Sequence, residues 1–258
     1  MSGHDAEHTR PPPAGTLRFF ASVPHDCSYL PERTAVTVFA DPDAEMNMDR
    51  YGALAELGFR RSGAHVYSPH CPQCQACVAV RLPVARFSPN RSQRRSQRRL
   101  PKISVKVLSA KYREEQFQLY RRYIGARHPG GGMDDPDPAK YMEFLHCDWA
   151  DTEFVEFRSG QSLLAVAVMD LLPRGLSSVY TFFEPAMSDI SPGRLALLWQ
   201  IQETRYRGLP WLFLGYWIGA CRKMQYKQEY RPIELFLDGR WQSFEPGQAL
   251  PSRAAEQA

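Results

Sequence analysis

The chain has 258 residues, of which 43% are hydrophobic; this ordinary globular composition excludes a wholly disordered, collagen-like or coiled-coil protein. No uninterrupted apolar run approaches the roughly 18 residues that a membrane-spanning helix requires, so the sequence predicts no membrane span. The net charge of +4 is unevenly distributed, because residues 57–113 contain thirteen Lys or Arg and no Asp or Glu. Such a one-sided basic segment favours a polyanion partner, above all nucleic acid, over a merely solvated basic face.

The N-terminal half is predicted to begin with a leader that precedes short strands and helices. Residues 1–15 are rich in proline and polar residues and lack an apolar signal core, so we expect a disordered leader on a cytoplasmic protein. Ser88 followed by Pro89 is typical of a helix start, with Ser88 as the N-cap of a helix that runs to about Arg99. A further helix is predicted over residues 49–57. Apolar segments predict strands over residues 34–39, 64–67, 78–83 and 103–107.

A change of composition near Ala110 divides the chain into two predicted domains. We expect a basic, Cys-containing N-terminal domain over residues 16–109 and a mixed, aromatic-rich domain over residues 110–247, followed by a disordered tail over residues 248–258. In the second domain the sequence predicts helices over residues 112–126, 140–147 and 191–206, with a loop over residues 128–138.

Four strands complete the second domain. Those over residues 153–158, 163–170 and 177–183 have short, glycine-containing connections and are predicted to pair antiparallel. The strand over residues 211–218 is apolar without alternation, so it should be buried on both faces and parallel to a neighbour. This order of elements predicts an α/β protein with a mixed, α+β-type sheet and a GNAT-like acyltransferase core. Because a fold does not determine a function, the chemistry has to come from the site.

A cysteine cluster is the first candidate site. Cys71, Cys74 and Cys77 follow one another at two-residue intervals, and Cys27 is a candidate fourth thiolate, with His70 as a competing ligand. Thiolates with this spacing favour zinc or an iron–sulfur cluster, and basic neighbours should lower the thiol pKa. The alternative is three reduced cysteines in a turn. The remaining cysteines are interpreted as non-ligands: Cys147 and Cys221.

A tandem Ser-Gln-Arg-Arg repeat lies within residues 91–99 and is the second candidate site. On a helix, Arg94 lies over Arg98 and Arg95 over Arg99, and such like-charged pairs cost a few tenths of a kcal/mol each. A phosphate backbone would relieve this repulsion, so the repeat favours a nucleic-acid contact that recognises charge and shape rather than bases. The alternative is an exposed arginine helix with no partner.

The third candidate site is the C-terminal block over residues 214–235, in which a buried strand runs into a glycine-containing turn. Active sites of α/β sheets tend to follow such strand ends. Lys223 and Lys227 are four residues apart and are predicted to share one face of a helix. A core strand followed by an ordinary amphipathic segment explains the same pattern equally well.

Several blocks together resemble the arginyl-tRNA–protein transferase family, in its bacterial aspartate/glutamate leucyltransferase branch, over about residues 19–241. The matching blocks lie in residues 27–31, 67–81, 91–94, 180–183, 191–193 and 214–232. The resemblance implies a GNAT-like enzyme that moves leucine from leucyl-tRNA to the N-terminal amine of a protein that begins with Asp or Glu, marking that protein for N-end rule degradation. Charged tRNA is then a co-substrate, and we expect a monomer with no membrane contact.

The implied chemistry requires no cofactor, because the aminoacyl ester is already activated. The α-amine has a pKa of about 7.7–8.0, so a strong general base is not required, and positioning can supply much of the rate. We expect Tyr180, Tyr216 and Tyr226 to line the catalytic site, with Asp170 as a candidate proton acceptor.

The acidic side chain of the acceptor requires a cationic pocket, for which Arg91, Lys223 and Lys227 are the candidates. The other basic residues of the repeat region are assigned to tRNA: Arg94, Arg95, Arg98, Arg99 and Lys102. In eukaryotic members of the family the N-terminal cysteines resemble an iron–sulfur or metal site. Here the triplet spacing departs from the paired arrangement of those members, so zinc, an iron–sulfur cluster and no metal all stay open.

Three alternatives share these features. One is the same reaction with arginyl-tRNA as the donor, since no identifiable pocket residue separates leucine from arginine. Another is a non-enzymatic RNA-binding protein with a cysteine metal module. A redox sensor built on the cysteines is the third, and it is compatible with either of the others.

Overall fold

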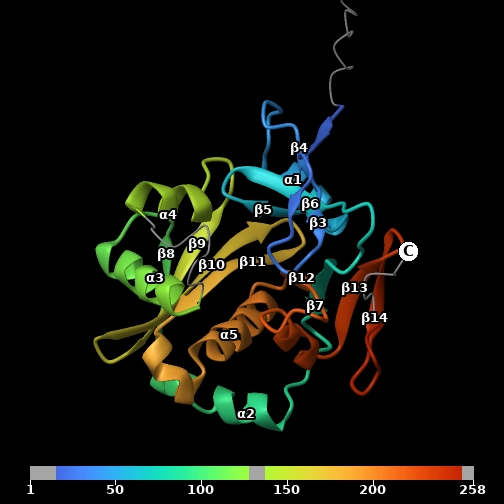
Figure 1. The fold of residues 1–258 in the computed structure, drawn as a ribbon. Coiled ribbons are helices and arrows are strands. Elements are labelled where there is room, and N and C mark those ends of the chain that lie inside the picture. The colour runs from blue at the N-terminus through green and yellow to red at the C-terminus, as the bar shows by residue number, and fades with distance from the viewer. Residues whose placement is uncertain (1–15, 128–136, 252–258) are drawn as a thin grey trace, which may run out of the picture.

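The computed structural model describes residues 16–127 and 137–251 of the chain. Its centre is an eight-stranded mixed sheet with helices on both faces, and a smaller sheet lies near the top of the view in Figure 1. In sheet order the eight strands are β14 (Arg240–Phe244), β13 (Ile233–Leu237), β7 (Val78–Pro83), β12 (Trp211–Trp217), β11 (Gly175–Phe183), β10 (Ser162–Leu172), β9 (Thr152–Ser159) and β8 (Ser104–Ser109).

Helix α5 (Pro192–Tyr206) covers one face of this sheet. Alternate residues of β7, Val78 and Val80 among them, point to this face and join Leu198 and Ile201 of α5 in the largest buried cluster. Because a strand presents every second side chain to each face, the other residues of β7 serve the opposite layer. Helix α2 (Arg91–Gln97) packs against α5 at the lower end of the molecule (Figure 1).

Two separate groups of elements cover the opposite face. Helices α3 (Glu114–Arg127) and α4 (Pro138–Leu145) pack on β9, β10 and β11 through an aromatic cluster that includes Tyr120, Tyr141 and Phe182. Helix α1 (Met48–Glu56) covers the sheet beside them. The small sheet next to α1 has the order β1 (Phe19–Ala21), β4 (Thr37–Ala40), β6 (His65–Pro69) and β5 (Arg60–Ser62), and β2 (His25–Asp26) pairs with β3 (Thr34–Ala35).

The mixed sheet and the predicted order of elements in the second half of the chain are confirmed. Strands β9, β10 and β11 pair antiparallel, and β12 runs parallel to β11 and antiparallel to β7. Five strands were not predicted: β1, β2, β5, β13 and β14. They have two to five residues each, so their local sequence does not distinguish them from loop. No helix in the described residues is long and apolar enough to cross a membrane.

The predicted start of the arginine helix is wrong. Asn90, not Ser88, is the N-cap of α2, and its side chain accepts from the backbone N–H of Gln93 while the Gln93 side chain accepts from the N–H of Asn90. This reciprocal capping satisfies two N–H groups, which a cap at Ser88 would leave open. The helix also ends earlier than predicted, and η1 (Leu100–Lys102) follows it.

The boundary near Ala110 stays a prediction, but strands β7 and β8, which precede it, belong to the large sheet. The predicted leader lies outside the described residues, as do residues 128–136 of the predicted loop. Of the predicted tail, residues 248–251 are described, and Leu250 packs against the largest core cluster.

Candidate active site

The large sheet opens between two of its central strands. Strands β11 and β12 pair over only three residues each and part after Ser177 and Phe213. Just beyond this point, Leu214 and Gly215 of β12 together oppose the single residue Val80 of β7. Such a β-bulge bends the strand that carries it. Gly215 has a φ of +73°, which a glycine adopts without strain.

Strand β11 carries a matching irregularity. Val168 of β10 pairs with Tyr180 and the next residue, Met169, pairs with Ser178, so Val179 is the extra residue of a second bulge. The two parallel strands therefore bend at the same level, immediately after their last shared pair. The space between their carboxyl ends is where a ligand-binding crevice of an α/β sheet is expected.

The predicted tyrosines on the two strands have different roles. Tyr216 of β12 is buried, and its hydroxyl donates to the carbonyls of Gly58 (2.9 Å) and Tyr67 (3.2 Å), which ties β12 to the small sheet. The hydroxyl of Tyr180 on β11 is buried and has no hydrogen-bond partner among the described residues. Burial raises the pKa of Tyr180, and the hydroxyls of Tyr123, Tyr120 and Tyr29 raise it further. Of the two, only Tyr180 has a hydroxyl without a hydrogen-bond partner among the described residues.

The predicted pairing of Lys223 with Lys227 on one helix face is wrong. The segment after β12 forms a short 3-10 helix, η3 (Gln225–Glu229), which starts after Lys223. Lys227 is buried, whereas Lys223 and Tyr226 are exposed. A single 3-10 turn cannot carry the four-residue spacing of an α-helix over both lysines.

Lys227 reaches the opening from η3. Its ammonium donates to the backbone carbonyl of Tyr216 and lies 3.6 Å from the sulfur of Met224. A Cβ atom added to Gly215 would lie 3.9 Å from this nitrogen, so the ammonium lies beside the bulge. Burial, aided by the positive charge of Arg60, lowers the pKa of Lys227 to about 7, although Cys221 and Cys77 act in the opposite direction.

The four predicted cysteine ligands lie near one another, and Cys221, a predicted non-ligand, lies with them. Burial raises the pKa of Cys77 to about 12, and the thiols of Cys27, Cys71, Cys74 and Cys221 raise it further. The expectation that basic neighbours lower the thiol pKa is therefore wrong for Cys77, because this thiol is buried and has other cysteines around it. Two of the thiols have backbone partners: Leu30 N–H donates to Cys27 and Val36 N–H to Cys71.

The arrangement of these thiols does not fit a metal ion. Within residues 16–127 and 137–251, no group of three or more His, Cys, Asp or Glu side chains is placed to hold one together. This holds for His70 as well, which is exposed.

Tyr29 and Arg60 were not singled out in the sequence, although both lie at the opening. Loss of solvent around its hydroxyl raises the pKa of Tyr29, and the nearby Tyr67 and Cys77 side chains raise it further. Because Tyr29 also acts on Tyr180, its loop approaches both strands of the opening. Nothing in the local sequence distinguishes these residues, since Tyr29 lies in the loop between β2 and β3 and Arg60 is one of many arginines.

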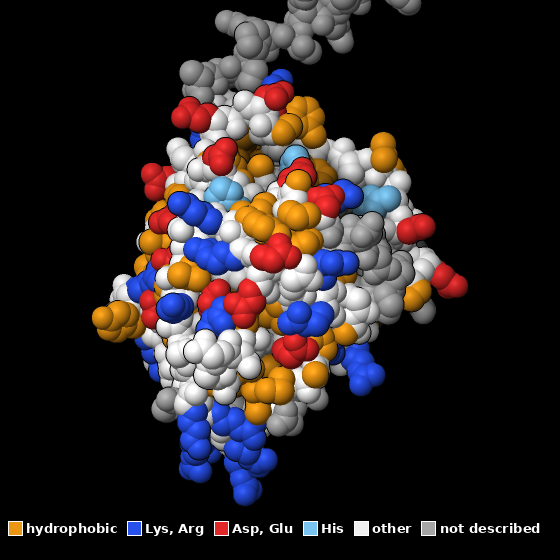
Figure 2. All heavy atoms as spheres, turned by 90° about the vertical axis from the view of Figure 1, so that its left-hand side faces the viewer, with side chains coloured by type: hydrophobic (Ala, Val, Ile, Leu, Met, Phe, Trp, Pro, Cys, Tyr) orange, Lys and Arg blue, Asp and Glu red, His pale blue; other side chains and the backbone are white. Residues whose placement is uncertain are grey.

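The arginine helix lies at the lower end of the molecule, where Lys and Arg side chains gather (Figure 2). Arg91, Arg94, Arg95, Arg98 and Lys102 are exposed, while Arg99 is half-buried. Three of the thirteen basic residues in the acid-free segment are instead buried: Arg60, Arg61 and Arg81. The basic surface is thus smaller than its sequence predicts.

Helix α2 is joined to η3, which carries Lys227. The side-chain amide of Gln93 donates to the Glu229 carbonyl (3.1 Å). Arg194 of α5 donates to Ser92 (2.6 Å) and to the carboxylate of Glu229 (3.3 Å). The cationic helix and the opening of the sheet are therefore connected through one polar bridge.

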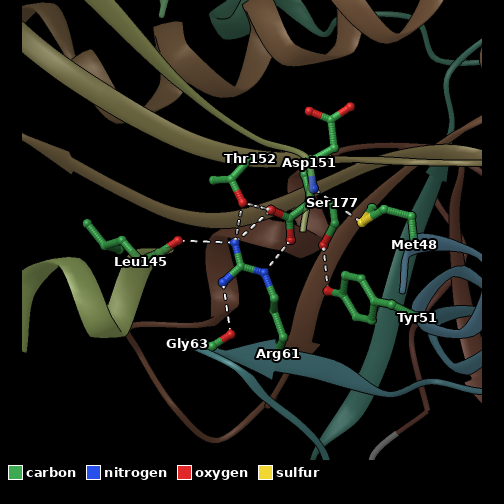
Figure 3. A network of polar contacts seen from close by, with 9 residues as sticks. Met48, Tyr51, Arg61, Gly63, Leu145, Asp151, Thr152 and Ser177 are labelled. Carbon is green, nitrogen blue, oxygen red and sulfur yellow. Dashed lines mark hydrogen bonds and ion pairs between the residues drawn. The ribbon is translucent and has the colours of Figure 1, made fainter. Parts of the chain in front are cut away.

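Asp170 has a structural role in place of the catalytic one that we expected. Its carboxylate accepts two hydrogen bonds of 2.6 Å from Arg61 and one of 2.8 Å from Thr152, and the Asp170 and Arg61 side chains are both 0% exposed (Figure 3). Arg61 also donates to the carbonyls of Gly63 and Leu145, which joins the small sheet, α4 and β10. A carboxylate so engaged is not available to accept a proton from a substrate.

Two family models match the chain. The N-terminal model of the arginine-tRNA-protein transferases matches residues 25–95, and the C-terminal model matches residues 115–237. Aspartate/glutamate leucyltransferases from Pseudomonas aeruginosa and Pseudomonas fluorescens are 52% and 51% identical over 225 residues, which are 87% of this chain and 96% of each relative.

Solved structures show a more distant likeness. FemX has a TM-score of 0.46 at 10% identity and covers 76% of this chain and 68% of its own. The C-terminal domain of a putative lysylphosphatidylglycerol synthetase from Agrobacterium fabrum has a TM-score of 0.43 at 13% identity, over 66% of this chain and 51% of its own. The family models and the close relatives decide the assignment: this chain belongs to the arginine-tRNA-protein transferase family.

Proposed function

We propose that this protein transfers leucine from leucyl-tRNA to the N-terminal amine of proteins that begin with Asp or Glu. Relatives named aspartate/glutamate leucyltransferase match at 52% identity over 87% of the chain. The observation that carries the proposal in the structure is the opening between β11 and β12, with the cationic helix α2 attached beside it. These features support the proposal, because the reaction needs a cationic surface for a polyanion next to a crevice for two reacting groups.

The reaction at this opening is the attack of an amine on an activated ester. The nitrogen of the acceptor bonds to the leucyl carbonyl carbon, the bond to the ribose oxygen breaks, and that oxygen takes a proton. Holding the two groups in reacting geometry removes most of the entropic barrier. A β-bulge leaves its extra residue outside the hydrogen-bond pairing of the two strands. We therefore assign a backbone N–H of the bulge at Leu214 and Gly215 to the developing oxyanion.

The tyrosines at the opening line the path of the aminoacyl group. The partner-free hydroxyl of Tyr180 and the exposed ring of Tyr226 are the groups that we assign to substrate contact. Tyr216 positions β12 through its two carbonyl partners. We assign three cationic groups to the acceptor site: Lys227, which is buried, and Arg91 and Lys223, which are exposed.

The tRNA is assigned to α2 and the segment that follows it. Arg94, Arg95, Arg98, Arg99 and Lys102 project from these elements, and phosphate contacts of this kind bind without reading bases. No cofactor is needed for the chemistry, and zinc or an iron–sulfur cluster at the cysteines is not part of the proposed mechanism. A monomer that works in the cytoplasm completes the proposal.

A transfer assay tests the proposal directly. Purified protein is supplied with radiolabelled leucyl-tRNA or arginyl-tRNA in parallel, and peptides that begin with Asp, Glu, Arg or Ala serve as acceptors. Label that moves from leucyl-tRNA to the Asp and Glu peptides alone is the expected result. Transfer from arginyl-tRNA would keep the family and overturn the donor.

The same assay separates the remaining alternatives. If no label is transferred to any peptide by protein that still binds tRNA, the result would favour a non-enzymatic RNA-binding protein. Full transfer after mild oxidation, or in a variant without Cys71, Cys74 and Cys77, would exclude the cysteines as a redox sensor.

A further inference from the structure

Two buried cations lie at the inner end of the opening without a carboxylate beside them. Arg60 and Lys227 are each 5% exposed. Among the described residues, no ion pair includes either side chain. The other two buried arginines are both paired: Arg61 with Asp170, and Arg81 with Glu234 and Glu56. A buried positive charge without a counter-charge is costly, so this pair is unlike the rest of the interior.

Backbone groups hold Arg60 in place. Its two terminal nitrogens donate to the carbonyls of Ala55, Phe59 and Val80, while its buried Nε has no hydrogen-bond partner among the described residues. The guanidinium lies over the ring of Phe213, 5.3 Å from its centroid, on the strand that forms one side of the opening. Arg60 is thus fixed but not neutralised.

Tyr216 connects the two cations. Its carbonyl accepts from the ammonium of Lys227, and its hydroxyl donates to the carbonyl of Gly58, two residues before Arg60. Tyr67, which pairs with Arg60 across β5 and β6, lies with its ring centroid 6.1 Å from that of Tyr216. The positive charge of Arg60 also lowers the pKa of Lys227, so the two charges act on each other.

We propose that Arg60 and Lys227 together form the pocket that selects an acidic first residue in the acceptor protein. Lys227 contacts the side-chain carboxylate, and Arg60 supplies a second, deeper charge behind it. This rests on the proposed function, because it assigns the selected residue of the acceptor to a place in the same opening. A carboxylate offsets the burial of both cations, whereas the neutral amide of Asn or Gln has the same shape and offsets neither.

The competing explanation is structural, since Arg60 binds carbonyls at the end of α1 and Lys227 binds Tyr216. A structural role predicts equal losses for all acceptors. A charge-selecting role predicts a loss for acidic acceptors only. The ratio of affinities for two matched peptides separates these explanations, because any effect on folding cancels in it.

The experiment compares peptides that begin with Glu and Gln and are otherwise identical. Calorimetry measures the Kd of each peptide without tRNA, and transfer from leucyl-tRNA gives kcat and KM. The variants are Lys227→Met, which keeps the length of the side chain, and Arg60→Gln, which keeps donors for the carbonyls. Arg240→Gln, an exposed residue on the β13–β14 hairpin away from the opening, is the matched control.

We expect Lys227→Met to weaken binding of the Glu peptide at least about 30-fold, the lower end for removal of one partner from a buried charge pair. Arg60→Gln should weaken it less, about tenfold, because Arg60 lies behind Lys227. Binding of the Gln peptide should change less than about twofold in both, and kcat should fall less than KM rises. Equal losses of affinity for the two peptides would overturn the proposed pocket. If Arg60→Gln does not fold, an unchanged ratio of the two Kd values in Lys227→Met is enough to overturn it. Failure of the proposed function looks different: the wild-type protein would select the Glu peptide but transfer nothing to it.

Discussion

The ammonium of Lys227 donates to the backbone carbonyl of Tyr216 at the point where β12 leaves β11. This contact connects a short helix to the bulged strand and places a basic group inside the opening. Because Tyr216 is also tied to the small sheet through its hydroxyl, one residue joins the lysine, the strand and the N-terminal layer.

The stability of the protein should depend on pH through Lys227. Its folded-state pKa of about 7 lies below the ordinary value of 10.5, so between these values the unfolded chain binds a proton that the folded chain does not. The free energy of unfolding therefore rises with pH from about 7 to 10.5, by several kcal/mol, and the full cost of the buried charge remains below pH 7. Arg60, Cys77 and Cys221 are the charged or titratable groups that act on this lysine.

Lys227→Met should remove this dependence and stabilise the protein most at neutral and lower pH. Urea denaturation of both proteins across pH 6–10 measures the difference between them. Two curves that stay parallel over the whole range would show that Lys227 keeps an ordinary pKa.

Asp170→Asn should destabilise the protein by about 3–5 kcal/mol, because it leaves the fully buried charge of Arg61 without a partner. Arg122→Gln is the control: it breaks the ion pair with Glu184, in which Arg122 is 52% exposed, and should cost no more than about 1 kcal/mol. Thermal unfolding measures both. A small effect of Asp170→Asn would mean that the network of Figure 3 contributes little to stability.

Cys77 should react slowly with alkylating reagents. Its pKa of about 12 leaves at pH 8 roughly a thousandth of the thiolate of an ordinary cysteine, and only the thiolate is the nucleophile. Iodoacetamide labelling followed by mass spectrometry gives the rate at this position, with a cysteine in a short peptide as the reference. Labelling at the rate of the peptide would contradict the raised pKa.

Arg98→Ala should weaken tRNA binding and flatten its dependence on salt. Each lost phosphate contact lowers the slope of log K against log salt by about 0.7–0.9. Arg91→Ala should instead raise KM for the acceptor peptide and leave the salt slope unchanged. Filter binding at several salt concentrations, together with transfer kinetics, checks both; identical behaviour of the two variants would overturn this division of the arginines.

Most of the second half of the fold was predictable because its signals are local. Short glycine-containing connections between β9, β10 and β11 allow only antiparallel pairing, and the unalternating apolar run of β12 requires burial on both faces. The start of α2 was misplaced for an equally local reason. Both Ser88 and Asn90 can cap a helix, and the reciprocal bonds with Gln93 select the second.

Side-chain roles were less predictable, because they depend on partners that are distant in sequence. Asp170 has the residue type of a base, but Arg61, 109 positions away, neutralises it in the core. Lys227 has the same residue type as Lys223, and only the turn geometry after β12 buries one and exposes the other.

The sequence by itself determined the class of the sheet, the basic character of α2, the cysteine cluster and the family resemblance. Each of these depends only on which residue types occur at which spacing along the chain. Only the tertiary structure decided where the opening lies and which cations face it. Two bulges, one on each strand, part β11 and β12 at the same level, and this depends on register with the flanking strands. Burial then distinguishes Arg60 and Lys227 from the other basic residues, because a charge removed from water acquires its role from what surrounds it.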